Sequence, residues 1–220
     1  MQNANHVVVV MNGVTRWAEA HGFSIPDAQR ESLAAARSVL AAAASAGVRY
    51  LTLQGDAAAL PTCAPDGSDA DFGAALANGL GLRAPDVHVT VSLDPSGRRD
   101  IARAVRDLAR SVKSGRLNPD ALDEALLRAS LQSAHLPDPD LIIYAGCGPG
   151  EHRLSDGFIY EAAYAEFHVS AVLWPAFSAP DFLRAIADFA GRQRRFGKTA
   201  EQIQGERGDA LGHLQSVPAL

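Results

Sequence analysis

Four consecutive valines, Val7 to Val10, constrain the fold more than any other feature of the sequence. β-branched side chains favour extended backbone, and a run without a polar residue predicts a strand buried on both faces, as in a parallel sheet. The run continues into Met-Asn-Gly, and a helical pattern follows at once. In α/β proteins, a strand, a glycine turn and a helix N-terminus in succession bind phosphate groups. The sequence therefore predicts an anion site around Gly13, although Asn12 offers a neutral amide there instead of an acid.

The rest of the chain alternates strand-like and helical segments. Apolar runs predict further strands at 48–55, 87–93 and 140–146, and a fifth at 170–174. Helical periodicity predicts helices at 27–46, 97–115, 118–131 and 178–197. Nearly continuous apolar strands that alternate with helices are typical of an α/β protein with a mainly parallel central sheet flanked by helices.

Local signals place the ends and faces of these helices. Gly47 should end the first long helix, and Asn118 with Pro119 should begin the helix at 118–131. Apolar residues at helical spacing predict the face of the 97–115 helix that packs on the core, namely Ile101, Val105, Leu108 and Val112.

Composition limits the class of protein. The chain has 220 residues, 47% of them hydrophobic, which suits one globular domain. A net charge of -5 argues against nucleic acid as the main partner. No apolar run is long enough to span a bilayer and no signal peptide is visible, so we expect a soluble, cytoplasmic protein. Cys63 and Cys147 match no metal or redox spacing.

Several motifs together resemble the cis-prenyltransferase family, which includes the undecaprenyl and dehydrodolichyl diphosphate synthases. The matching segments, in order, are HVVVVMNGVTRWAEAHG, GVRYLTL, SGRRDIARAVRDLA, LPDPDLII and RLSDGFIYEAAYAEFHVSAVLWPAF. The resemblance implies the family's α/β fold, shortened in the middle at 56–86. It also implies prenyl diphosphates as ligands, Mg²⁺ as the cofactor, and a homodimer or heterodimer in which each chain lends a C-terminal arginine motif to the other.

The departures from the family pattern gather at the site for the allylic diphosphate. Asn12 replaces the aspartate that holds magnesium, and Val14 replaces a polar neighbour. Ile25 and Gln29 stand where the family has an arginine and a histidine, and the loop at 56–61 lacks the usual polar side chains. Gly13 and Arg16 remain. Since Mg²⁺ prefers anionic oxygens, we expect weak metal binding at Asn12.

The second diphosphate site is better preserved. Tyr144 replaces an arginine that binds isopentenyl diphosphate, but the resemblance assigns Arg153 and Ser155 to that ligand and Glu166 to a possible magnesium role. Arg195 and Gly197 match the motif that crosses the dimer interface.

This combination is similar to the accessory subunits of heteromeric cis-prenyltransferases. It predicts a cis-prenyltransferase-like domain at 1–198, a polar tail at 199–220, and Arg195 donated to the site of a catalytic homologue. The alternative is a stand-alone enzyme of altered chemistry, such as irregular condensation or cyclisation of short prenyl diphosphates. A third possibility is a module that binds prenyl diphosphates without reaction.

Each of these residues also has a purely structural interpretation. Gly13 could serve the turn alone, and we expect Asn12 to cap the following helix. Arg153 and Ser155 follow a glycine-rich stretch that could be a connector, and Glu166 could pair with an arginine. Arg195 could be a solvated cation at a helix end. The seven histidines show no metal spacing, and we treat them as non-catalytic.

Overall fold

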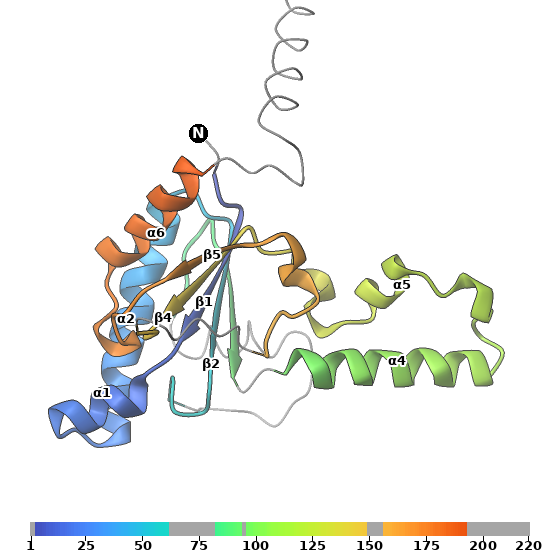
Figure 1. Ribbon diagram of the computed structural model, residues 1–220, viewed down its shortest axis with the longest axis horizontal. Helices are drawn as coiled ribbons and strands as arrows, with labels where there is room; N and C mark the ends of the chain where they lie inside the picture. The colour runs from blue at the N-terminus through green and yellow to red at the C-terminus, as the bar shows by residue number, and fades with distance from the viewer. Residues whose placement is uncertain (1–2, 62–81, 94–95, 149–155, 193–220) are drawn as a thin grey trace, which may run out of the picture. The chain divides into compact units, whose positions relative to one another are not determined.

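Five parallel strands form the central sheet, in the order β3-β2-β1-β4-β5 (Figure 1). The predicted fold class, a mainly parallel sheet flanked by helices, is confirmed. The strands are β1 (His6–Met11), β2 (Tyr50–Gly55), β3 (His88–Leu93), β4 (Leu141–Ala145) and β5 (Glu166–Val169).

The computed structural model describes residues 3–61, 82–93, 96–148 and 156–192. Residues Met1–Ala190 form one unit and Gly191–Leu220 a second, and only Gly191 and Arg192 of the second are described. The predicted boundary between 198 and 199 therefore stays a prediction.

The predicted fifth strand at 170–174 is wrong, because β5 lies four residues earlier in the chain. The segment after β5 instead bonds to the turns that leave β1 and β4. The carbonyls of Val172 and Ser170 accept hydrogen bonds from the N–H groups of Gly146 (2.7 Å) and Cys147 (2.9 Å). The N–H of Trp174 donates to the carbonyl of Asn12 at 3.0 Å. The apolar pattern of 170–174 thus reflects packing above the edge of the sheet.

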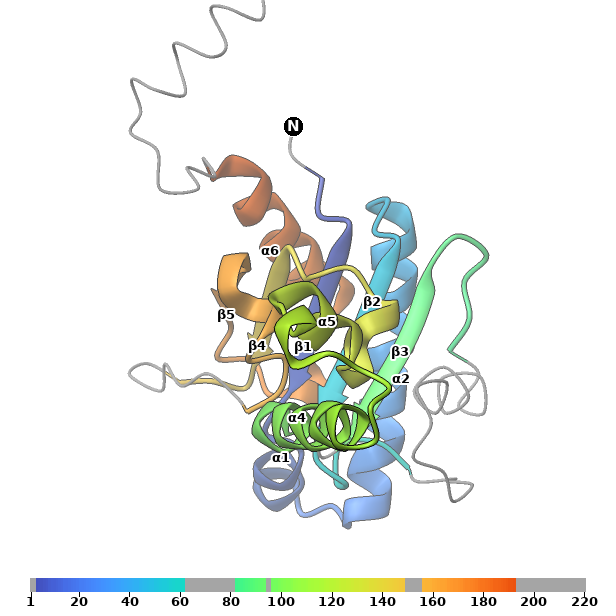
Figure 2. The same cartoon turned by 90° about the vertical axis from the view of Figure 1, so that its right-hand side faces the viewer.

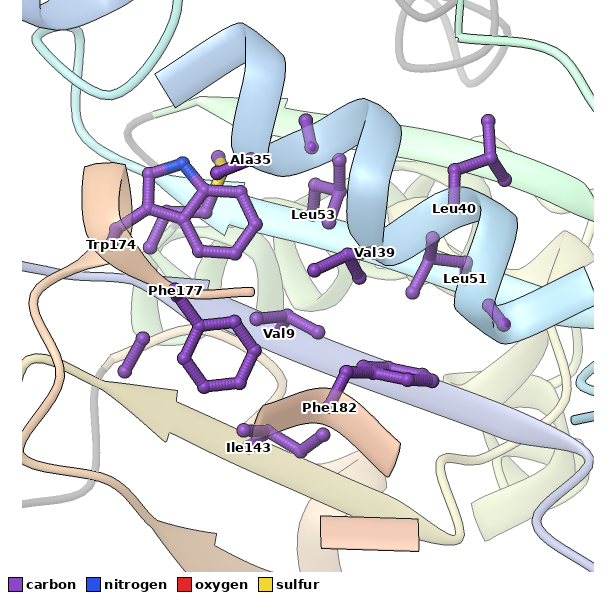
Figure 3. Packing of buried hydrophobic residues seen from close by; sticks show 14 of the residues in the cluster. Val9, Ala35, Val39, Leu40, Leu51, Leu53, Ile143, Trp174, Phe177 and Phe182 are labelled. Carbon is purple, nitrogen blue, oxygen red and sulfur yellow. The ribbon is translucent and has the colours of Figure 1, made fainter. Parts of the chain in front are cut away.

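Helices α1 (Val14–His21), α2 (Ile25–Ser45) and α6 (Ala179–Gly191) cover one face of the sheet (Figure 1). Figure 3 shows their packing, in which Val39 of α2 and the aromatic rings of Phe177 and Phe182 meet Val9 and Ile143. The hydroxyl of Ser24 caps α2. At the other end Gly47 adopts φ +73°, as expected for a glycine that ends a helix.

Helices α4 (Gly97–Lys113) and α5 (Glu124–Ala129) lie on the opposite side of the sheet (Figures 1 and 2). A smaller apolar cluster of Val8, Val10, Ile142 and Tyr144 occupies that face of the strands. The single helix expected at 118–131 is wrong. A short 3-10 turn at Pro119–Ala121 is capped by Asn118 and gives way to extended backbone at Leu122, before Asp123 caps α5.

Burial of α4 also differs from the expectation. Of its 17 residues only Ala104 is fully buried. Val105, predicted to face the core, is 51% exposed. The other three predicted residues, Ile101, Leu108 and Val112, are half-buried, so the described part of the chain covers this apolar face only in part.

His6, the first residue of β1, is a buried polar residue that contacts β2 and the segment before β4. Its Nδ1 lies 2.6 Å from the carbonyl of Pro137, and its Nε2 lies 2.9 Å from the hydroxyl of Thr52. A carbonyl only accepts, so Nδ1 carries the proton and Nε2 accepts from Thr52. Burial lowers the pKa of His6 from 6.5 to about 4. The ring is therefore neutral in the folded protein.

This geometry predicts a loss of stability in mild acid. Between pH 6.5 and pH 4 the unfolded chain binds a proton that folded His6 does not, so the free energy of unfolding falls as the pH falls. We expect His6 to account for a loss of about 2.5 kcal/mol between pH 7 and pH 4.5. Urea unfolding at the two pH values should show that loss shrinking in His6→Gln and persisting in the matched His135→Gln. An equal loss in all three proteins would contradict the assignment.

Candidate anion site at the carboxyl edge of the sheet

The turn after β1 requires a glycine for structural reasons. Gly13 has φ +91°, and a Cβ built on it would lie 2.5 Å from Cδ2 of Leu173. It is also the N-cap residue of α1, and its carbonyl accepts the N–H of Trp17 at 2.9 Å. The expectation that Asn12 caps α1 is wrong, because no side chain caps this helix. The side chain of Asn12 instead donates a hydrogen bond to Cys147.

Asn12 joins the exits of two strands. Its carbonyl holds Trp174, as described above, and its Nδ2 donates to the thiol of Cys147, with the nitrogen 3.7 Å from the sulfur. Cys147 is a free cysteine that follows β4. The position that resembles the family's magnesium aspartate therefore carries an amide whose nitrogen is turned toward a soft sulfur atom.

Gly146 and Arg16 complete this edge of the sheet. Gly146 has φ +68°, and its Cα packs so closely on the backbone of Asn12 that a side chain there would collide with it. A guanidinium nitrogen of Arg16 donates to the carbonyl of Gly146. The N–H groups in the first turn of a helix have no acceptor within the helix, and the helix dipole there favours negative charge. Arg16 and the N-terminus of α1 thus provide charge and donors for an anion.

Ile25 and Gln29 of α2 stand where the family resemblance expects an arginine and a histidine. Both side chains are uncharged, and Gln29 is already engaged in hydrogen bonds. Nε2 of Gln29 donates to the carbonyls of Ala57 and Leu60, each at 3.2 Å, so the side chain fastens the loop after β2. Ile25, the first residue of α2, is 37% exposed and offers only hydrocarbon. Val14, also changed, is buried in α1.

The donor set around Asn12 does not fit a resident magnesium ion. Among the residues that the structure describes, no group of three or more His, Cys, Asp or Glu side chains is placed to hold a metal. An amide and a thiol are poor substitutes for the anionic oxygens that Mg²⁺ prefers.

One acid near this edge, Asp56, was not among the residues predicted from the sequence. Asp56 directly follows β2, and Gly55 before it packs against Met11, the residue that precedes Asn12. Oδ1 of Asp56 accepts the N–H of Ala58 at 2.9 Å, so the carboxylate supports its own turn. The parallel pairing of β1 with β2 would have revealed this neighbour, but the pairing is not visible in the sequence.

Two further predicted site residues, Glu166 and Tyr144, lie in the sheet: Glu166 at its amino edge and Tyr144 buried within β4. Glu166 begins β5 and pairs with Leu141, at the amino edge of the sheet. Leu141 lies four residues before Ala145, the last residue of β4, so Glu166 is about 13 Å along the strands from the carboxyl edge of the sheet. Tyr144 is buried in β4, with its ring centroid 6.1 Å from that of Phe167. The remaining predicted site residues, Arg153, Ser155, Arg195 and Gly197, lie outside the described residues.

Comparison with known proteins identifies the family. Residues 80–197 match the prenyltransferase family model described as "Putative undecaprenyl diphosphate synthase". Isoprenyl transferase 2 of Bradyrhizobium diazoefficiens is 32% identical over 228 residues, which cover 87% of this chain and 89% of that protein. The chain therefore belongs to the cis-prenyltransferase family, whose members include prenyl diphosphate synthases.

Other relatives are more similar over a shorter stretch. The farnesyl-diphosphate-specific ditrans,polycis-undecaprenyl-diphosphate synthase of Pseudomonas putida is 44% identical over 114 residues, 52% of this chain. The match spans 44% of that relative's length. The structure of lavandulyl diphosphate synthase from Lavandula x intermedia superposes with a TM-score of 0.71, covering 89% of this chain and 99% of that one, at 24% identity. This likeness supports the fold. None of the described helices is both long and apolar enough to cross a bilayer.

Replacing the amide by an acid should restore metal-assisted binding. Asn12→Asp adds a charged oxygen in the turn before α1 without changing the size of the side chain. We expect Mg²⁺ to tighten the binding of geranyl diphosphate to this variant by about tenfold more than it does for the wild type. Isothermal titration with and without Mg²⁺ measures the difference, and Gln132→Glu, exposed and distant in the chain, is the control. Equal magnesium dependence in the wild type and Asn12→Asp would show that Asn12 is not the limiting residue.

Proposed function

We propose that this chain is an accessory subunit of a heteromeric cis-prenyltransferase, which condenses isopentenyl diphosphate with an allylic diphosphate. In this role the chain is itself weakly active or inactive. The observation that supports it most directly is the neutral turn at Asn12, where an amide bonded to Cys147 stands in place of the magnesium ligand. Gln29, bonded to two loop carbonyls, supports the same conclusion.

The contribution to the partner is electrostatic. Arg195, next to Phe196 and Gly197, would place a fixed positive charge beside the diphosphates in the partner's site. A preorganised cation stabilises negative charge as it develops on a departing diphosphate, without the cost of reorganising water. Arg153 and Ser155 supply a guanidinium fork and a hydroxyl, which suit the diphosphate of isopentenyl diphosphate.

The metal in this proposal belongs to the partner's site. Mg²⁺, which family enzymes use, neutralises the leaving diphosphate when it is bound. Glu166 at the amino edge of the sheet is too far along the strands to join Asn12 in the same chain. A magnesium role for Glu166 would therefore concern a different site from the Asn12 turn.

One observation favours the alternative, a stand-alone enzyme acting on short prenyl diphosphates. Arg16 and the N-terminus of α1 retain the anion-binding part of the turn even though the acid is absent. Turnover of dimethylallyl or geranyl diphosphate by the lone protein would establish this alternative. Tight binding without product would instead indicate a binding module.

Substitution of the donated arginine tests the accessory role. The chain is mixed with a catalytic cis-prenyltransferase from the same organism, and incorporation of labelled isopentenyl diphosphate is measured. We expect Arg195→Ala to lower the activity of the mixture by about a hundredfold or more, the scale seen when one preorganised charge donor is removed.

The neighbouring arginine provides the matched control. Arg194→Ala removes the same charge one residue away and should leave the mixture active. If Arg195→Ala has no effect while a complex still forms, the accessory role is refuted.

A further inference from the structure

Three aromatic residues from neighbouring strands form a row at the amino edge of the sheet. His6 of β1 pairs in register with Tyr50 of β2, and Tyr50 pairs with His88 of β3. Side chains alternate between the two faces along a strand, so residues in register point to the same face. The ring centroids of His6 and Tyr50 lie 6.1 Å apart, and those of Tyr50 and His88 lie 5.6 Å apart. The row ends at His88, which is exposed.

A second exposed histidine lies next to His88. His135 is the last residue of the 3-10 turn η2 (Gln132–His135), which precedes β4. Its ring centroid lies 6.4 Å from that of His88, with the ring planes at 68°. The histidines show no metal spacing in the sequence, because these two are distant in the chain and meet only through the fold.

Both rings have nitrogen lone pairs available. Nδ1 of His135 lies 3.0 Å from the carbonyl of Gln132. A carbonyl only accepts, so Nδ1 carries the proton and Nε2 keeps its lone pair. Histidines that bind metals are commonly oriented by such a bond from the other ring nitrogen. The ring of His88 packs on Tyr50 and makes no hydrogen bond within the described part of the chain.

We propose that His88 and His135 bind a zinc ion, each through one imidazole nitrogen. Zinc lies about 2.0–2.1 Å from a ligating nitrogen, which places the centroids of two ligating rings about 5–6 Å apart. The observed separation of 6.4 Å therefore requires only a small rotation of one exposed side chain. Since no group of three or more His, Cys, Asp or Glu in the described ranges is placed to hold a metal, water fills the remaining positions. Such a site binds more weakly than a structural site with four protein ligands.

The surroundings of His88 accommodate a hydrated cation. His88 lines an open hollow of about 780 Å³ together with Tyr50, Asp86 and Arg49. Asp86 and Arg49 are both exposed, and their opposite charges offset each other.

On the other side of the site, the acid near His135 is already paired. Asp138, three residues after His135, lies 2.9 Å from a guanidinium nitrogen of Arg128. The ion therefore meets no net positive charge on either side.

Zinc at this site would join the start of β3 to the turn before β4. The turn η2 is otherwise held to α4 by the N–H of Gln132, which donates to Asp100 at 2.9 Å. An ion that binds the folded chain better than the unfolded chain stabilises the fold. The site differs from the proposed magnesium chemistry, because imidazole nitrogens suit zinc whereas Mg²⁺ prefers oxygen ligands. The inference does not depend on the accessory role.

Titration calorimetry of the full chain, without an affinity tag and with Mg²⁺ present in excess, tests the site. We expect the wild type to bind one Zn²⁺ ion. His88→Ala and His135→Ala should each raise the dissociation constant by about tenfold or more, since each removes one of two protein ligands.

His21→Ala is the matched control. His21 is exposed, and its Nδ1 lies 2.8 Å from the carbonyl of Trp17, as the Nδ1 of His135 does from its own carbonyl partner. The rings beside His21, however, are those of Trp17 and Phe23, so no second imidazole is at hand. This variant should bind zinc as the wild type does.

Two further readouts separate metal binding from folding. Cu²⁺ binds to the same kinds of ligand as zinc and is visible by electron paramagnetic resonance, whose nitrogen splitting should indicate two imidazoles in the wild type and one in His88→Ala and His135→Ala. Zinc should raise the urea midpoint of the wild type and of His21→Ala, but not of the other two variants. Circular dichroism in EDTA should show the same fold in all four proteins.

The proposal is overturned if the wild type binds no zinc at about 100 µM free metal. It is equally overturned if His88→Ala and His135→Ala bind as tightly as the wild type, or if copper on the wild type shows a single imidazole. Arg195→Ala should bind zinc unchanged, so failure of the arginine role and failure of this site are distinguishable.

Discussion

The position of β1 between β2 and β4, parallel to both, is the constraint on which the rest of the structure depends. Val10 pairs with both Gln54 and Tyr144, so the exits of the three strands meet at one edge of the sheet. Gly146 can then pack against Asn12, Arg16 can reach the carbonyl of Gly146, and the carbonyl of Asn12 can hold Trp174. The buried valines thus stabilise the core and also place the turn residues.

This edge of the sheet combines the geometry of an anion site with neutral side chains around it. The left-handed glycine, the helix N-terminus and the arginine are in place. The neutral side chains of Asn12 and Gln29 near them make hydrogen bonds within the chain. Asn12 bonds to Cys147, and Gln29 secures the loop after β2. A helix N-terminus beside an arginine favours an anion, whereas Asn12 offers no anionic oxygen to a metal ion.

Much of the fold could be predicted from the sequence, because the strands of a buried parallel sheet are nearly uniform apolar runs. The four runs at 7–10, 48–55, 87–93 and 140–146 all lie in or over observed strands. The prediction failed where an apolar pattern served another purpose. The segment 170–174 packs above the sheet edge, and Val105 is half exposed on α4 although its apolar neighbours on the helix are half-buried. Periodicity shows that a face is apolar, but not what will cover it.

The site was less predictable for a different reason. Gly13 and Arg16 could be located because a strand, a turn and a helix follow one another in the chain. The partners of Asn12 and Gln29 come from residues that are distant in sequence, Cys147 in one case and the 57–60 loop in the other. Asp56 likewise becomes a neighbour only through strand pairing. Propensity and motif spacing carry no information about such contacts.

Diffraction from crystals of the lone protein, grown with Mn²⁺ in place of Mg²⁺ and with geranyl diphosphate, tests the central claim most directly. The anomalous signal of manganese locates the metal independently of the diphosphate. We expect a diphosphate beside Arg16 and the N-terminus of α1, with no metal bound to Asn12. A manganese ion within coordination distance of Asn12 Oδ1, about 2.2 Å, would contradict it.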